Sequence, residues 1–508
     1  MPAVLRHRLR SATAAVLLAA TAGACDSNSP TPSPSPTPTS PPVNQPPAFT
    51  SASTVSVAED VSTTTTIYQA AATDPEGSGV TYTIGGTDAA LFSMTSAGAL
   101  RFLASPDFEL PRDNGLDNVY DVQITASDGQ ASAALALKIT VTNNLEGITA
   151  TKWSLDDVAL SQLVGFYTPI DQGIGYGGYI FAAQRNGLLG MVSSFNNSPL
   201  WRYQIPDVAV DSERGLIAIA PAPEAFDAPG YMLDMYASTS GDIVIRRYRR
   251  FDETGFGSPS SIEVLRIPHA QYNNNMGGWL GSGPDGNLYV ATGDAGGSGD
   301  PTNSAQDSTS RLGKVLRISP DFATVTVVAK GLRNPSGGTF YNNMLVLGDR
   351  GESQREEINL IPLSGGTVGN YGWPYKEGSL TVRAGAPAGI IDPVLECPHQ
   401  AGPRGCYNIV TGLVAAANSS VVPWRGKLLF MERARPDRGG ALFAIPASRL
   451  VLGQPTIQSS EFEWLTNDAF DTPGGSFDPS AMNTVHDSGR TIAIANYATG
   501  RVWYYTSP

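Results

Sequence analysis

The stretch Gly286-Asn287-Leu288-Tyr289-Val290 is a turn followed at once by an apolar strand, and this unit decides the fold. Similar stretches start at Gly178, Gly230, Asn343, Gly426 and Gly489. Most successive starts lie roughly 50–60 residues apart, a period typical of one four-stranded unit per repeat. The chain is therefore predicted to be all-β, with a six-bladed β-propeller over residues 151–508 whose last strand, Arg501 to Tyr505, closes against the first.

The longest interval between these starts, from Asn343 to Gly426, contains an insertion with two cysteines, Cys397 and Cys406. Loops over a propeller face often carry function, so the insertion is a candidate part of the site. The short spacing predicts a disulfide between Cys397 and Cys406 in an oxidising compartment. A metal site with the nearby His399 is the alternative, although no CxxC spacing is present.

Residues 48–148 contain shorter runs in which apolar and polar residues alternate: Val55–Val57, Val80–Ile84, Tyr120–Ile124 and Leu135–Val141. Alternation with a period of two, interrupted by turn residues, is typical of half-buried strands. A small antiparallel β-sandwich is predicted here, as a domain separate from the propeller.

The first 47 residues predict export. Basic residues Arg6, Arg8 and Arg10 precede a short apolar stretch, and small residues lead to Cys25. This pattern predicts a signal peptide over residues 1–24 and, because it resembles a bacterial lipobox, lipidation of Cys25. Ordinary signal cleavage with Cys25 incidental is the alternative. Residues 25–47, rich in Pro, Ser and Thr, have nothing to bury and form an extended linker.

The net charge of −13 argues against nucleic-acid binding, because few basic residues are available to neutralise phosphates. An acidic surface favours solubility and divalent cations equally. The expected location is the cell envelope, with the protein anchored to a membrane through lipid on its periplasmic or extracellular face.

Several short motifs of the propeller segment occur in the order found in one family. They are Arg214–Ala220, Gly283–Tyr289, Thr292-Gly293-Asp294, Leu312–Ile318, Gly331-Leu332-Arg333-Asn334-Pro335, Gly348-Asp349, Glu356–Asn359 and Asn370-Tyr371-Gly372-Trp373-Pro374. Together they resemble the soluble glucose and sorbosone dehydrogenases that use pyrroloquinoline quinone (PQQ). The resemblance implies a sugar substrate, PQQ and Ca²⁺ as cofactors, and Arg333 and Asn334 as the pair that faces the cofactor's carboxylates.

The same resemblance implies a histidine base that takes the proton of the sugar C1 hydroxyl. The family pattern falls on Asn274–Leu280, and Asn275 occupies the histidine position. A carboxamide cannot accept a proton at neutral pH, so this position departs from the family. Three histidines beyond the signal segment are the alternatives: His269, His399 and His486.

The further cations that the family uses to hold its cofactor are less evident. Arg433, Arg435 and Arg438 lie in a suitable segment, with a solvated corner as the alternative interpretation.

The sandwich segment resembles a cadherin repeat. Glu59, Asp107 and Glu109 match the calcium-binding acids at one end of such a repeat, and Asp74 and Asp128 match those at the other. Clustered carboxylates suit Ca²⁺, which binds oxygen ligands. Solvated turn residues are the alternative interpretation.

Two functions remain open from the sequence. One is an exported PQQ-dependent aldose dehydrogenase with impaired or rearranged catalysis. The other is a non-catalytic surface propeller that binds a glycan or protein, with the cadherin-like segment as a spacer or adhesive module. A propeller hosts many functions, so the fold does not choose between them.

Overall fold

The computed structural model describes residues 43–108, 111–115, 117–142, 149–153, 162–167, 179–193, 199–223, 231–249, 260–269, 271–400, 405–433, 439–465, 478–484, 491–497, 500 and 502–506. The chain divides into two compact units, residues 1–45 and 46–508. The predicted signal segment, Cys25 and the linker up to residue 42 lie outside the described residues.

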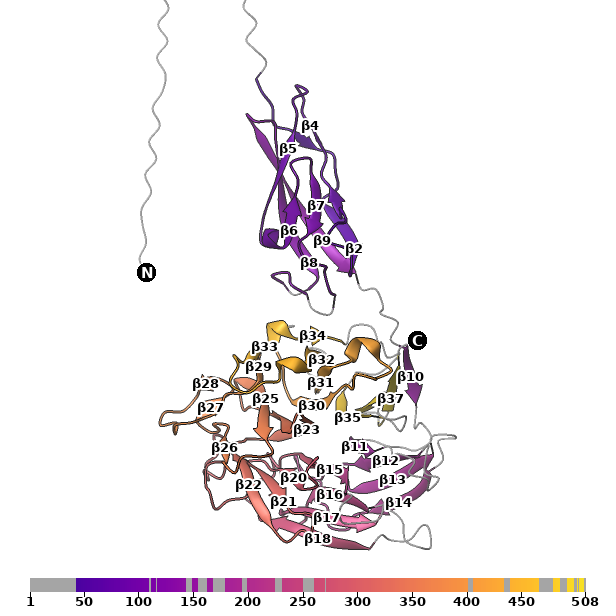
Figure 1. Cartoon of the computed structure of the whole chain (residues 1–508), viewed down its shortest axis with the longest axis vertical. Helices are drawn as coiled ribbons and strands as arrows, with labels where there is room; N and C mark the ends of the chain where they lie inside the picture. Colours follow the sequence, from indigo (N-terminus) through magenta and orange to yellow (C-terminus); the bar gives the residue numbers. More distant parts are fainter. Residues whose placement is uncertain are drawn as a thin grey trace, which may run out of the picture. The chain divides into compact units, whose positions relative to one another are not determined.

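Residues 48–142 form strands that pack around one core (Figure 1). The largest sheet has the order β2 (Thr54–Ala58), β9 (Ser132–Thr142), β8 (Val119–Ser127) and β5 (Thr81–Gly85). The others are β3 (Tyr68–Gln69), β7 (Ala99–Phe102), β6 (Phe92–Met94), and β1 (Ala48–Phe49) with β4 (Ala72–Thr73). Alternate residues of β8, such as Tyr120, Val122 and Ile124, are buried, as the period-two pattern predicts.

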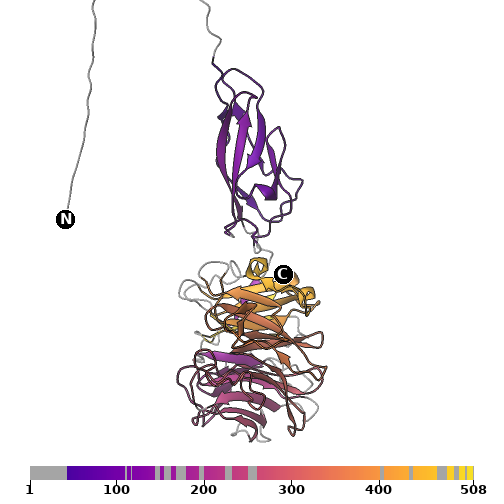
Figure 2. The ribbon, with the colours of Figure 1, turned by 90° about the vertical axis from the view of Figure 1, so that its left-hand side faces the viewer.

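The prediction of a purely antiparallel sandwich is wrong at one place. Strand β2 pairs with β9 in parallel, with Val55 opposite Ile139. The two strands are joined by the rest of the module rather than by a hairpin turn, and a long connection permits parallel pairing. The strands of this segment are drawn in indigo to purple in Figure 2.

Beyond residue 148 the described strands form six sheets of four or five strands. The sheets are β11 (Leu163–Tyr167), β12 (Tyr179–Gln184), β13 (Leu188–Ser193), β14 (Pro199–Gln204); β15 (Leu216–Pro221), β16 (Tyr231–Ala237), β17 (Ile243–Arg249), β18 (Ser261–Ile267); β19 (Trp279–Ser282), β20 (Leu288–Ala291), β21 (Lys314–Ile318), β22 (Val325–Lys330), β26 (Gly369–Asn370); β23 (Pro335–Tyr341), β24 (Met344–Asp349), β25 (Arg355–Pro362), β29 (Leu395–Pro398), β33 (Ile457–Gln458); β30 (Ile409–Val414), β31 (Lys427–Glu432), β32 (Ala441–Pro446), β34 (Glu463–Trp464); and β10 (Thr149–Trp153), β37 (Val502–Thr506), β36 (Ile492–Asn496), β35 (Pro479–Thr484).

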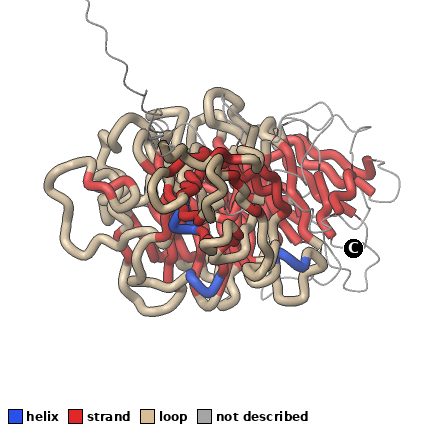
Figure 3. Tube along the Cα trace, turned by 90° about the horizontal axis from the view of Figure 1, so that it is seen from above, coloured by secondary structure: helices blue, strands red, loops and turns tan. Residues whose placement is uncertain are grey.

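Small elements complete the description. A two-stranded ribbon pairs β27 (Lys376–Glu377) with β28 (Leu380–Thr381). The 3-10 helices are η1 (Ala89–Leu91), η2 (Val422–Trp424), η3 (Ala447–Arg449) and η4 (Ser459–Glu461). Figure 3 shows that strands, in red, make up nearly all of the described regular structure.

Each repeat found in the sequence falls on the second strand of a different sheet. These strands are β12, β16, β20, β24, β31 and β36. The first strands contact one another in the order β11, β15, β19, β23, β30, β35 and back to β11, so the sheets form a closed ring. Neighbouring sheets share apolar cores; Leu233 of β16 and Val290 of β20 lie in one of them. The fold is a β-propeller.

The ring is closed by the two ends of the propeller segment. Strand β37 pairs with β10 over Thr149↔Thr506 to Trp153↔Val502, which confirms the predicted closure by the last strand. Because β10 begins at Thr149, this strand starts before the predicted boundary at residue 151. Pairing of strands from both ends of the propeller segment in one sheet holds the ring together.

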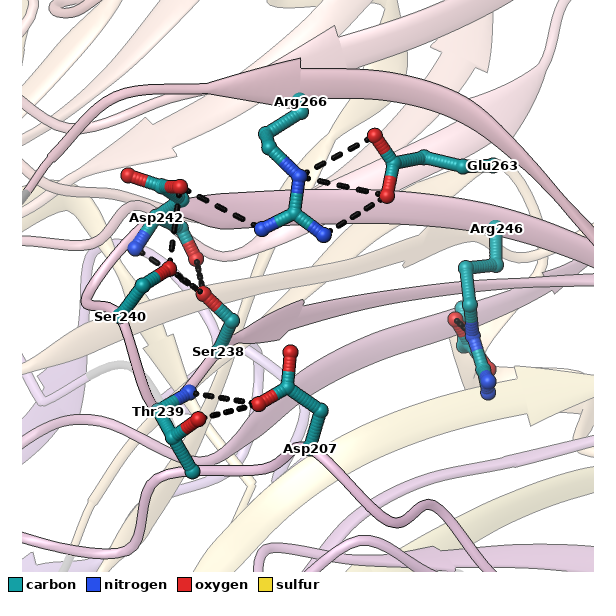
Figure 4. Close-up of polar contacts among 9 residues, drawn as sticks. Asp207, Ser238, Thr239, Ser240, Asp242, Arg246, Glu263 and Arg266 are labelled. Atoms are coloured by element: carbon teal, nitrogen blue, oxygen red, sulfur yellow. Dashed lines mark hydrogen bonds and ion pairs between the residues drawn. The ribbon is translucent and has the colours of Figure 1, made fainter.

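Polar contacts also stabilise single sheets, as in the β15–β18 sheet (Figure 4). Arg246 bonds through Nε and Nη2 to the two oxygens of Asp234, and both side chains are buried. Arg266 lies nearer the surface, between Glu263 and Asp242. Loss of one partner costs more in the buried Arg246–Asp234 pair than in the two pairs of Arg266, because it leaves a buried charge unpaired, whereas the more exposed pairs are screened by water.

Candidate functional site

Two adjoining cavities lie near the N-terminal ends of the first strands of the ring. The arginine cavity, of about 260 Å³, is lined by Arg185, Arg350 and Arg433 among others. The histidine cavity, of about 380 Å³, is lined by Asn275, Arg333, Asn334, Glu356 and His399 among others. Glu213, Asn334 and Arg350 line both cavities, so we treat them as one candidate site.

Asn275, which stands where the resemblance places the base, is held tightly. Its side chain is buried, and Nδ2 donates to Oδ1 of Asp294 at 3.0 Å. Its backbone N–H donates to Oε2 of Glu213 at 2.8 Å. The residue has φ of 53°, in the left-handed region that asparagine tolerates better than most residues. A carboxamide in this position donates to Asp294 but cannot remove a proton from a substrate.

Glycines explain why the loop of Asn275 can pack so closely on its neighbour. A Cβ on Gly293 would lie 1.8 Å from the carbonyl oxygen of Asn275. Gly277 has φ of +81°, and a Cβ there would lie 2.4 Å from the backbone nitrogen of Gly293. The glycine in Thr292-Gly293-Asp294 therefore lets this loop place Asn275 next to Asp294.

Asp294 connects two of the sequence motifs. Its Oδ2 accepts a hydrogen bond from Nε1 of Trp373 at 2.8 Å, and its Oδ1 accepts one from the backbone of Gly296 at 2.8 Å. Burial raises the pKa of Asp294 to about 6, against the effect of these donors, which favour the ionised form. Near neutral pH this carboxylate is ionised and accepts from Asn275.

Arg333 and Asn334 are positioned by Asp349. The backbone N–H groups of Arg333 and Asn334 donate to the two oxygens of Asp349, at 2.9 and 2.7 Å. The Arg333 guanidinium lies 5.5 Å from the ring of Trp373, and its Nη1 donates to the backbone oxygens of Arg350 and Gly351. Both residues thus line the histidine cavity.

Further cations surround the same space. Burial, with repulsion from Arg433, lowers the pKa of Arg350. Arg433 bonds through Nε and Nη2 to Asp478 and lies 4.0 Å from the ring of Tyr497. Of the three arginines predicted in that segment, Arg433 lines the arginine cavity, whereas Arg435 and Arg438 lie outside the described residues.

Some donor atoms of these arginines are buried without a partner. Nη2 of Arg185, Nε of Arg333 and Nε of Arg350 make no hydrogen bond within the described part of the chain. The acids of the site are already engaged: Glu213 accepts from Asn275, and Glu352 accepts from the backbone of Gly299. A buried donor without a partner is costly, so the cavities suit a ligand that supplies negatively charged acceptors.

The three alternative histidines differ in position. His399 lines the histidine cavity and contacts Glu356. His269 is buried, and burial lowers its pKa; it lines neither cavity. His486 lies outside the described residues. His399 is therefore the described histidine placed at the site.

The insertion that carries His399 is tied to the propeller. Cys397 and Cys406 form a disulfide, and both are buried. Strand β29, which contains Cys397, pairs with β25, which contains Glu356. The structure therefore shows the predicted disulfide at these cysteines rather than the alternative metal site.

The acidic residues of the sandwich segment are not gathered into one described cluster. Glu59 is buried and accepts a hydrogen bond from the backbone of Phe108 at 2.8 Å, next to Asp107. Asp74 and Asp128 each accept two backbone N–H bonds of their own turns. Glu109 lies outside the described residues. Within the described ranges, no group of three or more His, Cys, Asp or Glu side chains is placed to hold a metal ion.

Sequence reasoning missed Arg185, Glu213 and Arg350 as parts of the site. Arg350 directly follows the Gly348-Asp349 motif, and this position was the signal in the sequence that could have identified it. Glu213 likewise directly precedes the Arg214–Ala220 motif, whereas Arg185 belongs to no motif, so only the packing of the ring brings Arg185 to the arginine cavity.

No helix within the ranges that the structure describes is both long and apolar enough to cross a membrane.

Comparison with solved structures places the propeller among known folds. A glucose dehydrogenase has a TM-score of 0.52 and 18% identity, covering 70% of this chain and 99% of that one. A Thermus thermophilus protein described as an oxidoreductase (glucose dehydrogenase) has a TM-score of 0.50 and 21% identity, covering 70% of this chain and 99% of that one. At these identities the likeness concerns the fold.

Comparison of sequences identifies the family. The HIPL2 protein of Arabidopsis thaliana is 30% identical over 165 residues, which are 26% of this chain and 23% of that protein. The chain thus matches less than a quarter of this relative. The family model described as Glucose / Sorbosone dehydrogenase matches residues 175–429, half of the chain. The chain, a β-propeller with an arginine-rich cavity at its ring, belongs to the glucose/sorbosone dehydrogenase family.

Proposed function

We propose that the protein is an exported, PQQ-dependent dehydrogenase of aldose sugars. The observation that carries the proposal is the set of buried guanidinium donors in Arg185, Arg333 and Arg350 that have no partner within the described residues. Family membership supports a sugar substrate and makes PQQ the expected cofactor.

The residues at the cavities fit such a cofactor. PQQ carries three carboxylates, and planar guanidinium groups bind carboxylates through two hydrogen bonds. Arg333, Asn334 and Arg350 would hold these carboxylates, since they adjoin one another and line the histidine cavity. When bound, the quinone supplies a two-electron oxidant that accepts a hydride from the sugar C1.

The chain's own groups then have separate tasks. Trp373 and Asp349 position Arg333, the first through its ring and the second through the backbone. Asp294 holds Asn275 in the wall of the site. Burial and then repulsion from Arg433 lower the pKa of Arg350, and an anionic ligand would offset that repulsion.

The experiment is a titration of the purified protein with PQQ, followed by the absorbance of the quinone. Arg350→Gln should weaken binding about 10- to 100-fold, the loss expected for a hydrogen bond to a charged group. Arg266→Gln is the matched control, because Arg266 lies between Glu263 and Asp242 and lines neither cavity. Wild-type protein that binds no PQQ would contradict the proposal.

A second candidate function rests on Asn275. Because this residue cannot serve as a base, a propeller that binds a surface glycan or another protein without catalysis also accounts for the site. In that case the arginines would hold an acidic glycan or peptide. Binding of an acidic glycan together with no PQQ binding would favour this candidate.

The segments before the propeller are proposed to place it on the cell surface. Lipid on Cys25 would anchor the protein, and residues 48–148 would act as a cadherin-like, calcium-binding spacer or adhesive module. Buried Glu59 beside Asp107 supports a cation site at one end, and Oδ2 of Asp74, buried and without a hydrogen-bond partner among the described residues, supports one at the other.

A further inference from the structure

His399 and Glu356 form a hydrogen-bonded pair in the wall of the histidine cavity. The His399 Nε2 and Glu356 Oε1 atoms are 2.5 Å apart. The two side chains are 8% and 2% exposed, and the imidazole stacks on the ring of Tyr407 at 4.9 Å between centroids. Asn275, Arg333 and Asn334 line the same cavity, so the pair faces the space proposed for cofactor and substrate.

Backbone contacts hold both members of the pair. The backbone N–H of His399 donates to the carbonyl oxygen of Gln354 at 2.9 Å. Oε2 of Glu356 accepts from the backbone N–H of Ile409 at 3.0 Å. The disulfide of Cys397, two residues before His399, fixes the same loop. A base that is already held in position before the substrate binds loses little conformational entropy when the reaction takes place.

The hydrogen bonds also decide which ring nitrogen carries the proton. An ionised carboxylate only accepts, so His399 Nε2 donates its hydrogen to Glu356. In the neutral ring Nδ1 is then the acceptor, and the hydrogen bond of the His399 ring in the described part of the chain is the one that Nε2 makes with Glu356. This is the arrangement of a base whose partner carboxylate orients it and stabilises its charged form.

We infer that His399, oriented by Glu356, is the general base that replaces the histidine missing at position 275. The inference rests on the proposed function and names the proton acceptor of that reaction. The O–H bond at C1 of the bound aldose breaks and its proton goes to Nδ1 of His399. The C1–H bond breaks as hydride leaves for the quinone, and C1 becomes the carbonyl of the lactone. The sugar loses two electrons and the quinone gains them.

Kinetics test the base directly. With PQQ and an aldose such as glucose, His399→Asn should lower kcat/KM by about 10²–10⁴, the usual contribution of a positioned base. The PQQ titration should be unchanged in this variant, because the arginines hold the cofactor. Glu356→Gln should lower kcat/KM less, since the imidazole stays in place while its orientation and charge stabilisation are lost.

Nuclear magnetic resonance tests the pair without cofactor or turnover. The chain has four histidines, so ring-¹⁵N labelling gives few signals, and His399→Asn identifies the one that belongs to His399. At neutral pH this ring should carry its hydrogen on Nε2, and Glu356→Gln should change that signal. Glu352→Gln is the matched control for the spectrum, because Glu352 lines the same cavity but bonds to Gly299 rather than to His399.

The outcomes separate the base from the function. The role of His399 as the base is contradicted if kcat/KM is unchanged in His399→Asn, or if the His399 ring carries its hydrogen on Nδ1. The proposed function then still stands. A wild type that binds no PQQ overturns the proposed function. A wild type that binds PQQ but oxidises no aldose also contradicts the role of His399 as the base, since an intact pair of His399 and Glu356 should support turnover. Loss of rate with retained PQQ binding and an Nε2 hydrogen supports the inference.

Discussion

Replacing Asn275 by histidine is the sharpest test of how catalysis is arranged. The substitution puts an imidazole beside Asp294, at the position the family resemblance assigns to the base. Histidine tolerates the φ of 53° found there, and a ring N–H can replace the 3.0 Å bond from Asn275 Nδ2 to Asp294 Oδ1. The larger ring has room to extend, because Asn275 lines the histidine cavity of about 380 Å³.

The size of the effect depends on whether a base is already present. A positioned base contributes about 10²–10⁴ in rate. If His399 is the base, Asn275→His alone should change kcat/KM little. In a His399→Asn background, the same substitution should recover about 10²-fold of the lost rate or more.

The pH dependence gives a second signature of the rescued enzyme. Asp294 can orient and stabilise an imidazolium only when it is ionised, and burial raises its pKa to about 6. The kcat/KM of the double variant should therefore rise as the pH increases through about 6. The assay measures aldose oxidation with PQQ and Ca²⁺ from pH 5 to 8, with PQQ binding of each variant as the control.

Two results would refute this reasoning. A gain of 10²-fold or more from Asn275→His alone would mean that the wild type has no working base, against the role of His399. A double variant that binds PQQ yet stays as slow as His399→Asn would mean that substrate does not reach the surroundings of Asp294.

Three further predictions concern the rest of the chain. Arg246→Met should lower the free energy of unfolding by about 3–5 kcal/mol, because it leaves Asp234 buried and unpaired; Arg266→Met should cost less than about 1 kcal/mol, and equal losses in urea unfolding would contradict the ranking. Cys25→Ser should release the protein from membranes, whereas a wild type shown by mass spectrometry to be unacylated would end the anchor hypothesis. Saturating Ca²⁺ at about 100 times its dissociation constant should stabilise the module containing Glu59 by about 2.7 kcal/mol, and a melting transition that ignores chelator would count against that site.

Local patterns in the sequence were sufficient to predict one strand in each sheet of the propeller. A Gly or Asn turn followed by an apolar run specifies a strand through nearby residues, and all six such runs became the second strand of a sheet. The pairing of β37 with β10 was predicted from the same repeat. The last sheet is incomplete without a strand from the start of the propeller segment. Proximity in sequence likewise allowed the pairing of Cys397 with Cys406 to be predicted.

Pairings between distant segments needed the tertiary structure. The alternating pattern of β2 is the same for either direction of pairing, so it could not reveal that β2 runs parallel to β9. The motifs containing Asp294, Arg333 and Trp373 carry no sign in the sequence that they meet, yet Asp294 bonds to Trp373 across 79 residues.

The candidate base shows the same division. The sequence established that Asn275 departs from the family and that His399 lies in an insertion, but not what His399 contacts. The register of β25 with β29 brings Glu356 next to His399 across 43 residues, and the ring of sheets brings Arg185 and Arg350 to adjoining walls. Sequence alone determined the repeating strands, because turns and apolar periodicity act locally; the composition of the site was decided by packing between sheets, which no local pattern encodes.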